Sequence, residues 1–229
     1  KETTLLLVIF ALALIVRIIF VFSSPIKMWD ETVYANLGYE LSQNIFHYSF
    51  DQHGWSDRIP DGSWPKAGFR APLLPYFLSI FYFFNLSFLI SLIMPLVGAF
   101  TILLLYSFSK RLFDKQTAIF SAMFLLFLPL HVLYSSKILT DVFSAFFILA
   151  SIFSFWRGYE EKNKKHKLLF GFFLALALLS RYTTLWIIPV FFIYLVVRDK
   201  SLKFLSDKYL WYSIAIFFIA LTPWLIYGH

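Results

Sequence analysis

Two adjacent carboxylates, Asp30 and Glu31, open the first long polar segment of the chain, shortly after an apolar run at residues 4–22. One interpretation is structural, because Asp is a favoured N-cap and Glu is favoured in the first turn of a helix. The other is chemical: a carboxylate at an apolar boundary can have its pKa raised until it accepts a proton from a reacting hydroxyl, or it can bind a metal ion. Both interpretations can hold together, because a cap fixes the backbone that aims the side chain.

A third carboxylate, Asp141, lies just inside the apolar run 139–156. A carboxylate in the middle of a membrane helix costs roughly 2.5–3.5 kcal/mol, and less near its end. Either Thr140 or Asp141 could cap the helix, and Asp141 could equally be a second functional acid. Lys137, four residues upstream, could pair with it, although a surface pair contributes little stability.

Three arginines stand near the ends of apolar runs. Arg70 comes directly before Ala71 and Pro72, and proline is typical of a first helical turn. A guanidinium beside a helix N-terminus suits phosphate oxygens, whereas a snorkelling interfacial arginine is the alternative. Arg181 separates two apolar runs, as a turn or as a partner for phosphate or carboxylate. Arg17 lies about five residues from the end of the first run, where it could snorkel to the interface, and we favour an inward ion pair with one of the acids.

Histidines provide candidate metal ligands beside the acids, although no pair has a diagnostic spacing. The sequence places His47, His53 and His131 in or near polar segments, and it contains no cysteine, so thiolate metal sites and disulfides are excluded. Asp30, Glu31 and His53 are therefore the candidate ligands for a divalent cation (Mg, Mn or Zn).

The composition indicates a multi-pass membrane protein. Of the 229 residues, 60% are hydrophobic and only 14% are charged, well below the roughly 25% charged residues of soluble domains. The net charge of +7 comes mostly from lysines and arginines in short loops, which is typical of cytoplasmic loops near anionic lipid and argues against a nucleic-acid partner. No strand alternation is present, so an all-α fold is predicted.

The apolar runs predict about seven transmembrane helices within one module, 1–229. The long outer loop 23–85 is expected to hold two interfacial helices, 31–45 and 73–84, because the second is too short to span comfortably. With this count all three basic loops face the cytoplasm, as the positive-inside rule requires. The charged groups Asp30, Glu31, Arg70, Lys137, Asp141 and Arg181 then share the outer membrane interface. The predicted crossings are 4–22, 86–109, 117–134, 139–156, 168–180, 183–197 and 209–227.

The order of several short motifs resembles a known family. This chain is similar to the N-terminal module of GT-C-fold, polyprenyl-phosphate-dependent glycosyltransferases, nearest to the protein O-mannosyltransferase and aminoarabinose transferase branch. The resemblance covers essentially the whole chain, and its specificity lies in the order of the motifs. They are Asp30-Glu31 with Tyr34, Arg70-x-Pro72-Leu73-x-Pro75, Lys110-Arg111-Leu112-Phe113, Leu139-Thr140-Asp141, Leu179-Ser180-Arg181-Tyr182-Thr183 and Thr222-Pro223-Trp224-Leu225-Ile226-Tyr227.

The resemblance implies roles for these residues. In that family the Asp-Glu motif of the first outer loop is catalytic, a second acid lies in the second outer loop, and the basic residue before the prolines contacts the lipid phosphate. Ala71 stands where relatives usually have a first proline, and the family's C-terminal part is not represented in this chain. The implied catalytic residues are Asp30, Glu31 and Asp141, and the implied substrate-binding residues are Arg70, Arg181, Lys137, Arg17 and Tyr34.

The implied activity is transfer of a hexosyl or pentosyl group from a polyprenyl-phosphate donor to a hydroxyl of a protein or lipid, with inversion. Its partners would be the lipid donor, the acceptor and the bilayer, at the outer face of a cell membrane or of the endoplasmic reticulum membrane. The alternatives are a module without transfer activity that binds lipid or assembles into a larger complex, and, more weakly, a transporter. A transporter is expected to carry charges through the depth of its bundle, whereas here they cluster at one interface.

Overall fold

The structure is a computed structural model that describes residues 2–24, 28–48 and 70–227. Helix accounts for 85% of these residues and none of them forms a strand, so the all-α prediction is confirmed. The elements are α1 (Glu2–Ser23), α2 (Trp29–Gln43), α3 (Leu73–Phe83), η3 (Ser87–Leu89), α4 (Ile90–Leu112), α5 (Lys115–Phe127), α6 (Pro129–Tyr134), α7 (Thr140–Tyr159), α8 (Lys164–Ser180), η4 (Tyr182–Ile187), α9 (Ile188–Asp199), η5 (Lys203–Ser206) and α10 (Lys208–Tyr227).

Five helical segments of the described chain are long and apolar enough to cross a membrane. They are Glu2–Ser23, Ser87–Leu112, Thr140–Tyr159, Tyr182–Asp199 and Lys208–Ile226. The predicted count of seven stays a prediction, because α5 and α8 are shorter than a comfortable span.

The predicted single helix 117–134 is wrong, since the run is divided into α5 and α6. Leu128 has extended backbone angles, and Pro129 is the first residue of α6. Proline has no N–H to donate and disfavours helical geometry in the residue before it, so α5 ends at Phe127 and a new helix begins. The apolar composition alone did not reveal this break.

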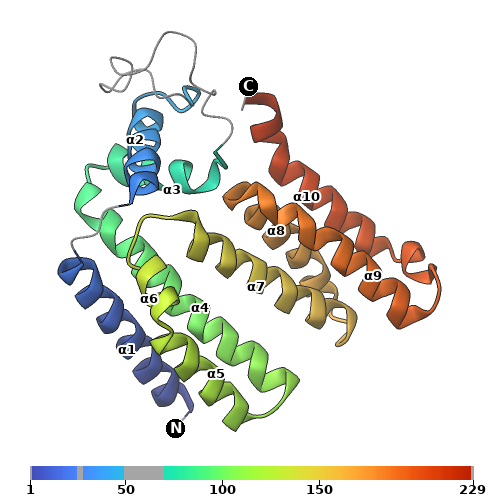
Figure 1. The fold of residues 1–229 in the computed structure, drawn as a ribbon. Helices are drawn as coiled ribbons and strands as arrows, with labels where there is room; N and C mark the ends of the chain where they lie inside the picture. The colour runs from blue at the N-terminus through green and yellow to red at the C-terminus, as the bar shows by residue number, and fades with distance from the viewer. Residues whose placement is uncertain (1, 25–27, 49–69, 228–229) are drawn as a thin grey trace.

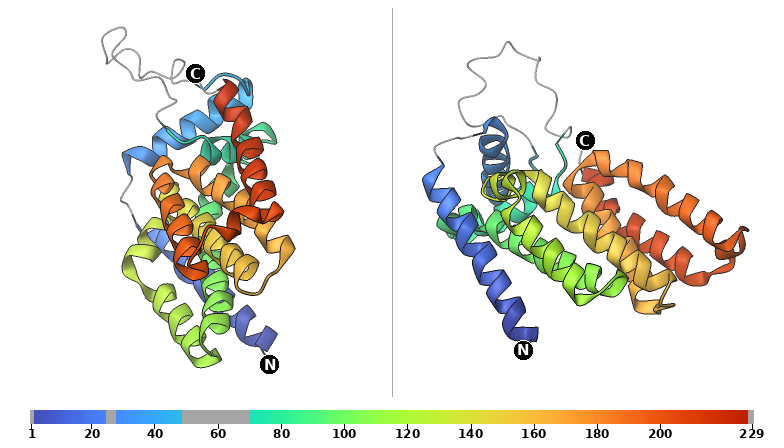
Figure 2. Two further views of the ribbon diagram at one scale, coloured as in Figure 1. Left: turned by 90° about the vertical axis from the view of Figure 1, so that its right-hand side faces the viewer. Right: turned by 60° about the horizontal axis from the view of Figure 1, so that its bottom comes forward.

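The long helices pack as a row, with α1, α4, α7, α8 and α10 each in contact with the next (Figure 1). One apolar core joins α1, α4 and α5, and another joins α7, α8, α9 and α10. Helices α2 and α3 pack on one another across one end of the row and are held to α4 and α7 by a smaller core around Leu74, Leu78 and Phe143. The further views show the N-terminus at the opposite end from α2 and α3 (Figure 2).

The end of the row that carries the N-terminus also gathers the three basic loops. Lys110 pairs with Glu2 at 2.5 Å, Arg111 pairs with Glu161 at 2.7 Å, and Arg198 pairs with Glu160 at 3.3 Å. These contacts link the start of α1, the α4–α5 loop, the α7–α8 loop and the end of α9. The three basic loops therefore share one end of the molecule, as the positive-inside count requires.

Gly171 allows α8 and α10 to approach closely, and Gly171→Ala is expected to destabilise the fold strongly. A Cβ at this position would lie 2.0 Å from the backbone oxygen of Ser213, so the two helix backbones would have to separate. Overpacking of this kind costs about 3 kcal/mol at the upper end of the usual range. Thermal unfolding in detergent measures the loss. Phe172→Ala, at the neighbouring exposed position of the same helix, serves as the control, and an equal effect of the two substitutions would contradict the close-packing argument.

Candidate active site

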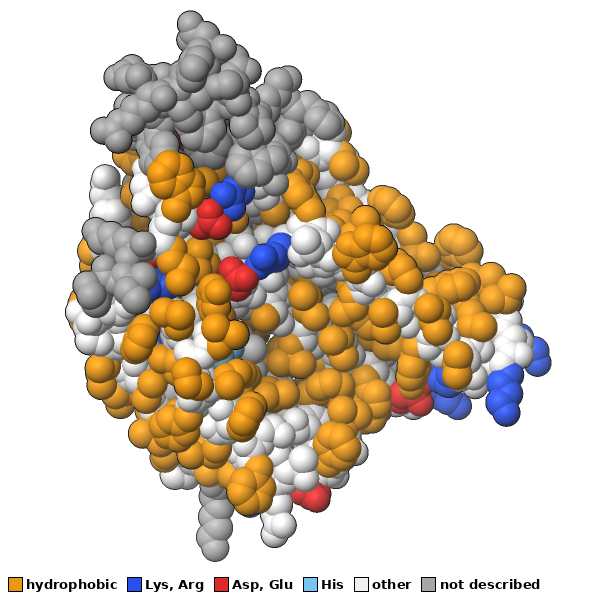
Figure 3. Space-filling model, in the orientation of Figure 1, with side chains coloured by type: hydrophobic (Ala, Val, Ile, Leu, Met, Phe, Trp, Pro, Cys, Tyr) orange, Lys and Arg blue, Asp and Glu red, His pale blue; other side chains and the backbone are white. Residues whose placement is uncertain are grey.

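Four segments far apart in the sequence meet at the end of the row formed by α2 and α3. They are the start of α2, residue 70 before α3, the loop between α6 and α7 with the first turn of α7, and the junction of α8 and η4. Two neighbouring pairs of acidic and basic side chains are visible on a mostly apolar face (Figure 3). The predicted gathering of charged residues is thus observed for Asp30, Glu31, Arg70, Asp141 and Arg181.

The first pair joins Asp30 of α2 to Arg70. Nη2 of Arg70 donates to Oδ1 of Asp30 at 2.7 Å, and Nη1 donates to the Tyr34 hydroxyl at 3.4 Å. The guanidinium also lies 5.5 Å from the centre of the Tyr34 ring, within cation–π range. Burial opposes the charged form, but the bonds to Asp30 and Tyr34 outweigh it and raise the pKa of Arg70. The Asp30 side chain is 42% exposed, so a substrate can reach it.

The backbone of Arg70 is held independently of its side chain. Its carbonyl oxygen accepts a hydrogen bond from the Tyr48 hydroxyl at 3.2 Å and from the Tyr182 hydroxyl at 3.3 Å. Burial raises the pKa of Tyr48 well above its usual value, which keeps this hydroxyl protonated as a donor. No sequence pattern pointed to Tyr48, whereas Tyr182 belongs to the motif around Arg181 and could have been found from it.

The second pair joins Asp141 in the first turn of α7 to Arg181 at the C-terminal end of α8. Both side chains are partly exposed. The residue before α7 is Leu139, which makes no side-chain cap, so the alternative in which Thr140 or Asp141 caps this helix is wrong. Asp141 points to Arg181 instead, and Lys137 is buried in the preceding loop.

The carboxylate of Glu31 binds two backbone N–H groups and takes no part in the Asp30–Arg70 pair. Its Oε2 accepts from the N–H of Met28 at 2.9 Å, and its Oε1 accepts from the N–H of Ile138 at 3.0 Å. Met28 is the N-cap residue of α2, so the structural interpretation of Asp30 as the cap of this helix is wrong. Because Glu31 satisfies an N–H at the start of α2, the neighbouring carboxylate of Asp30 is left for Arg70.

Tyr34 links the two pairs. Its side chain is buried, and its hydroxyl lies 3.5 Å from Oγ1 of Thr140, the residue before Asp141. The same hydroxyl accepts from Arg70. Tyr34 therefore couples the first turn of α7 to the loop before α3. Thr140 is a further member of the site, which the sequence offered as a helix cap and as part of the motif around Asp141.

Among the described residues, Arg17 does not form the expected ion pair with an acid. Its side chain is fully buried, Nη1 donates to the Ala13 carbonyl at 2.9 Å, and Nη2 lies 2.7 Å from Nδ1 of His131. Because arginine can only donate, Nδ1 of His131 is the acceptor and Nε2 carries the proton. A Cβ at Gly98 would lie 2.8 Å from Nε of Arg17, so this glycine makes room for the guanidinium. Arg17 thus ties α1 to α6.

The divalent-cation site predicted at Asp30, Glu31 and His53 stays a prediction. Within the part of the chain that the structure describes, no group of three or more His, Asp or Glu side chains could hold a metal ion. His53 lies outside the described residues, and His131 is engaged by Arg17. The acids near the start of α2 are instead occupied by a guanidinium and by backbone N–H groups, so no step below is assigned to a metal.

Comparison with known proteins identifies one family. The family model described as dolichyl-phosphate-mannose-protein mannosyltransferase matches residues 69–227. The match includes Arg70, Asp141 and Arg181 and begins after Asp30 and Glu31. No curated protein and no solved structure matches the chain.

Proposed function

This chain belongs to the dolichyl-phosphate-mannose-protein mannosyltransferase family, and we propose that it transfers a sugar from a polyprenyl-phosphate donor to an acceptor hydroxyl. Family membership makes it a multi-pass membrane glycosyltransferase of the GT-C type. The donor, the acceptor and the roles of individual residues are the proposal. The observation that carries it is the convergence of two acid–guanidinium pairs at one end of an apolar helical row.

This arrangement suits a lipid-linked donor. A guanidinium pairs with phosphate oxygens through parallel N–H donors, and Arg70 and Arg181 both offer such groups at the same end. The long apolar helices beside them provide a bilayer setting for a polyprenyl tail. A donor with a charged phosphate and a long hydrocarbon tail matches both features.

Asp30 is the proposed general base. It accepts the proton of the acceptor hydroxyl while that oxygen attacks the anomeric carbon of the sugar. The bond between the anomeric carbon and the phosphate oxygen breaks in the same displacement, its electron pair leaves with the phosphate, and the configuration is inverted. Arg70 and Arg181 stabilise the developing charge on the leaving phosphate.

The ion pairs suggest how donor binding prepares the base. In the structure, Nη2 of Arg70 donates a hydrogen bond to Oδ1 of Asp30. A phosphate that takes over this guanidinium would release the carboxylate to accept a proton. In the proposal Asp141 orients the acceptor or Asp30, Tyr34 and Glu31 position the segments, and the site faces the outer side of the membrane, opposite the three basic loops.

A transfer assay tests the proposal. The 229-residue chain is reconstituted in liposomes with a radiolabelled polyprenyl-phosphate sugar and a hydroxyl acceptor. We expect label to appear in the acceptor, and the double variant Asp30→Asn/Arg70→Gln to give only background. If the wild-type chain binds the donor but transfers no label to any protein or lipid acceptor, the chain is a lipid-binding module and the proposed activity is wrong.

A further inference from the structure

An apolar cavity of about 390 Å³ lies among α7, α8, α9, η5 and α10, toward the end that carries the basic loops. Its volume falls within the range of roughly 300–1,000 Å³ that is usual for ligand pockets. Phenylalanines dominate its walls, including Phe155, Phe170, Phe191 and Phe217. No residue of the two acid–guanidinium pairs lines it, so it is separate from the candidate active site.

The cavity reaches the surface of the molecule. Three of its lining side chains, Phe192, Leu205 and Phe218, are exposed, as a lateral opening toward lipid requires. One polar group also lines it: the hydroxyl of Ser213 is buried and has no hydrogen-bond partner within the described part of the chain. A long apolar ligand that enters from the bilayer fits such a space better than water does, because its walls are otherwise apolar.

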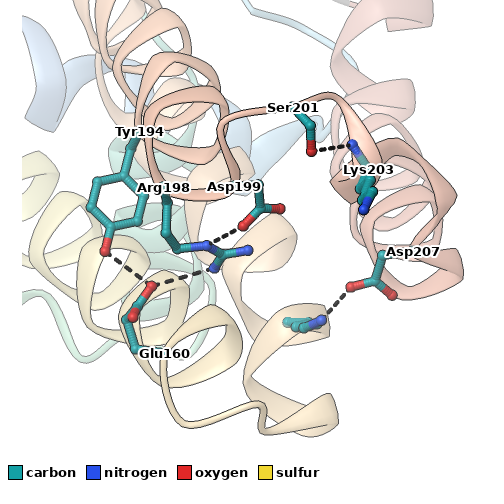
Figure 4. Close-up of polar contacts among 8 residues, drawn as sticks. Glu160, Tyr194, Arg198, Asp199, Ser201, Lys203 and Asp207 are labelled. Carbon is teal, nitrogen blue, oxygen red and sulfur yellow. Dashed lines mark hydrogen bonds and ion pairs between the residues drawn. The ribbon is translucent and has the colours of Figure 1, made fainter.

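The loops beside the cavity carry a surplus of positive charge. The three acids beside these loops, Glu160, Asp199 and Asp207, already have partners. Glu160 accepts from Tyr194 and Arg198, Asp199 accepts from Arg198, and Asp207 pairs with a lysine of α8 (Figure 4).

Three lysines in the same region are exposed and form no ion pair with a described acid. Lys200 follows α9, Lys203 begins η5, and Lys208 begins α10. Two of them are close in sequence to the cavity wall, because η5 contributes Phe204 and Leu205 and the start of α10 contributes Leu210. Positive charge therefore flanks an apolar cavity at one membrane interface.

We propose that this cavity and Lys200, Lys203 and Lys208 bind one anionic phospholipid. An acyl chain occupies the space between the phenylalanines, and the phosphate of the head group lies against the lysines. Basic groups beside clefts between membrane helices attract anionic head groups of the adjacent leaflet. This site does not depend on the proposed transfer reaction, because it lies at the opposite end of the helical row from Asp30.

The test compares phosphatidylglycerol with phosphatidylcholine. The purified 229-residue chain is titrated with each lipid, and binding is followed by native mass spectrometry and by thermal stabilisation. We expect one phosphatidylglycerol to bind preferentially. Lys200→Gln/Lys203→Gln/Lys208→Gln should weaken it about a hundredfold, because each lysine near an anionic lipid contributes several-fold to binding.

Two further variants separate charge from cavity. The control Lys115→Gln/Lys162→Gln/Lys165→Gln removes the same charge from exposed lysines of the other basic loops and should bind like the wild type. Leu205→Trp fills the mouth of the cavity without changing charge and should lose binding of the lipid. Equal binding of both lipids by the wild type, equal weakening in the control, full binding by Leu205→Trp, or preferential retention of a polyprenyl phosphate would each overturn the proposal.

Discussion

Asp30→Asn is expected to lower kcat for sugar transfer by about 10³-fold, within the range of roughly 10²–10⁴ that a positioned general base contributes. The amide keeps the shape of the side chain and an oxygen that can accept from Arg70, so α2 and residue 70 should stay in place. What it loses is the ability to take the proton of the acceptor hydroxyl. Initial rates at saturating donor and acceptor measure the effect, and equilibrium binding of the labelled donor should change little.

Asp199→Asn is the matched control for this experiment. Asp199 also accepts one 2.7 Å bond from an arginine, but it lies at the end of α9, with the basic loops. It should transfer sugar at the wild-type rate. A wild-type kcat for Asp30→Asn would remove Asp30 from the mechanism, and a loss of donor binding equal to the loss of rate would reassign it to donor recognition.

Arg70→Gln is expected to raise the Kd for the polyprenyl-phosphate donor about 10–100-fold, because a hydrogen bond to a charged group contributes roughly 1.5–3 kcal/mol. Glutamine retains part of the side-chain length without the positive charge. The backbone at this position should not move, since its carbonyl is held by Tyr48 and Tyr182. Donor binding and donor KM are measured in the same liposomes, and Arg70→Lys should recover part of the affinity because it restores the charge without the planar fork.

Arg111→Gln is the control for the loss of an arginine. Arg111 makes one 2.7 Å ion pair with Glu161, as Arg70 does with Asp30, but at the opposite end of the molecule. Its donor Kd should equal that of the wild type. If Arg70→Gln lowers kcat and leaves donor affinity intact, Arg70 acts only on the developing charge of the leaving phosphate, and the proposed contact with the bound donor is wrong.

Several features of the fold could be predicted from the sequence because they depend on local composition. Long apolar runs predict helices, and the helices α1, α4, α7 and α10 lie within a few residues of the predicted bounds. The break between α5 and α6 was missed, although Pro129 provided the signal. The interpretations of Asp30 and of Thr140 or Asp141 as helix caps were wrong, because Met28 and Leu139 precede the two helices and both aspartates face arginines instead.

For the candidate site, the sequence indicated which residues lie together but not which partner each of them has. Residue type and position identified Asp30, Asp141, Arg70 and Arg181 as members of one end of the molecule. The sequence did not show the partner of either acid: Asp30 faces an arginine, and Glu31 binds the backbone N–H groups of Met28 and Ile138. It also led to the wrong partner for Arg17, because its histidine partner is 114 residues away.

The sequence by itself therefore determined that the chain is helical, apolar enough to cross a membrane and charged in short clusters, since these properties follow from composition and hydrophobic runs. Only the tertiary structure decided which charges meet. Asp30 and Arg70 are 40 residues apart, as are Asp141 and Arg181, and each pair forms because α2 and α3 pack together and α7 packs along α8. Asp30 and Glu31 are adjacent acids in the sequence, and packing is what left Asp30 facing a guanidinium while Glu31 binds backbone N–H groups.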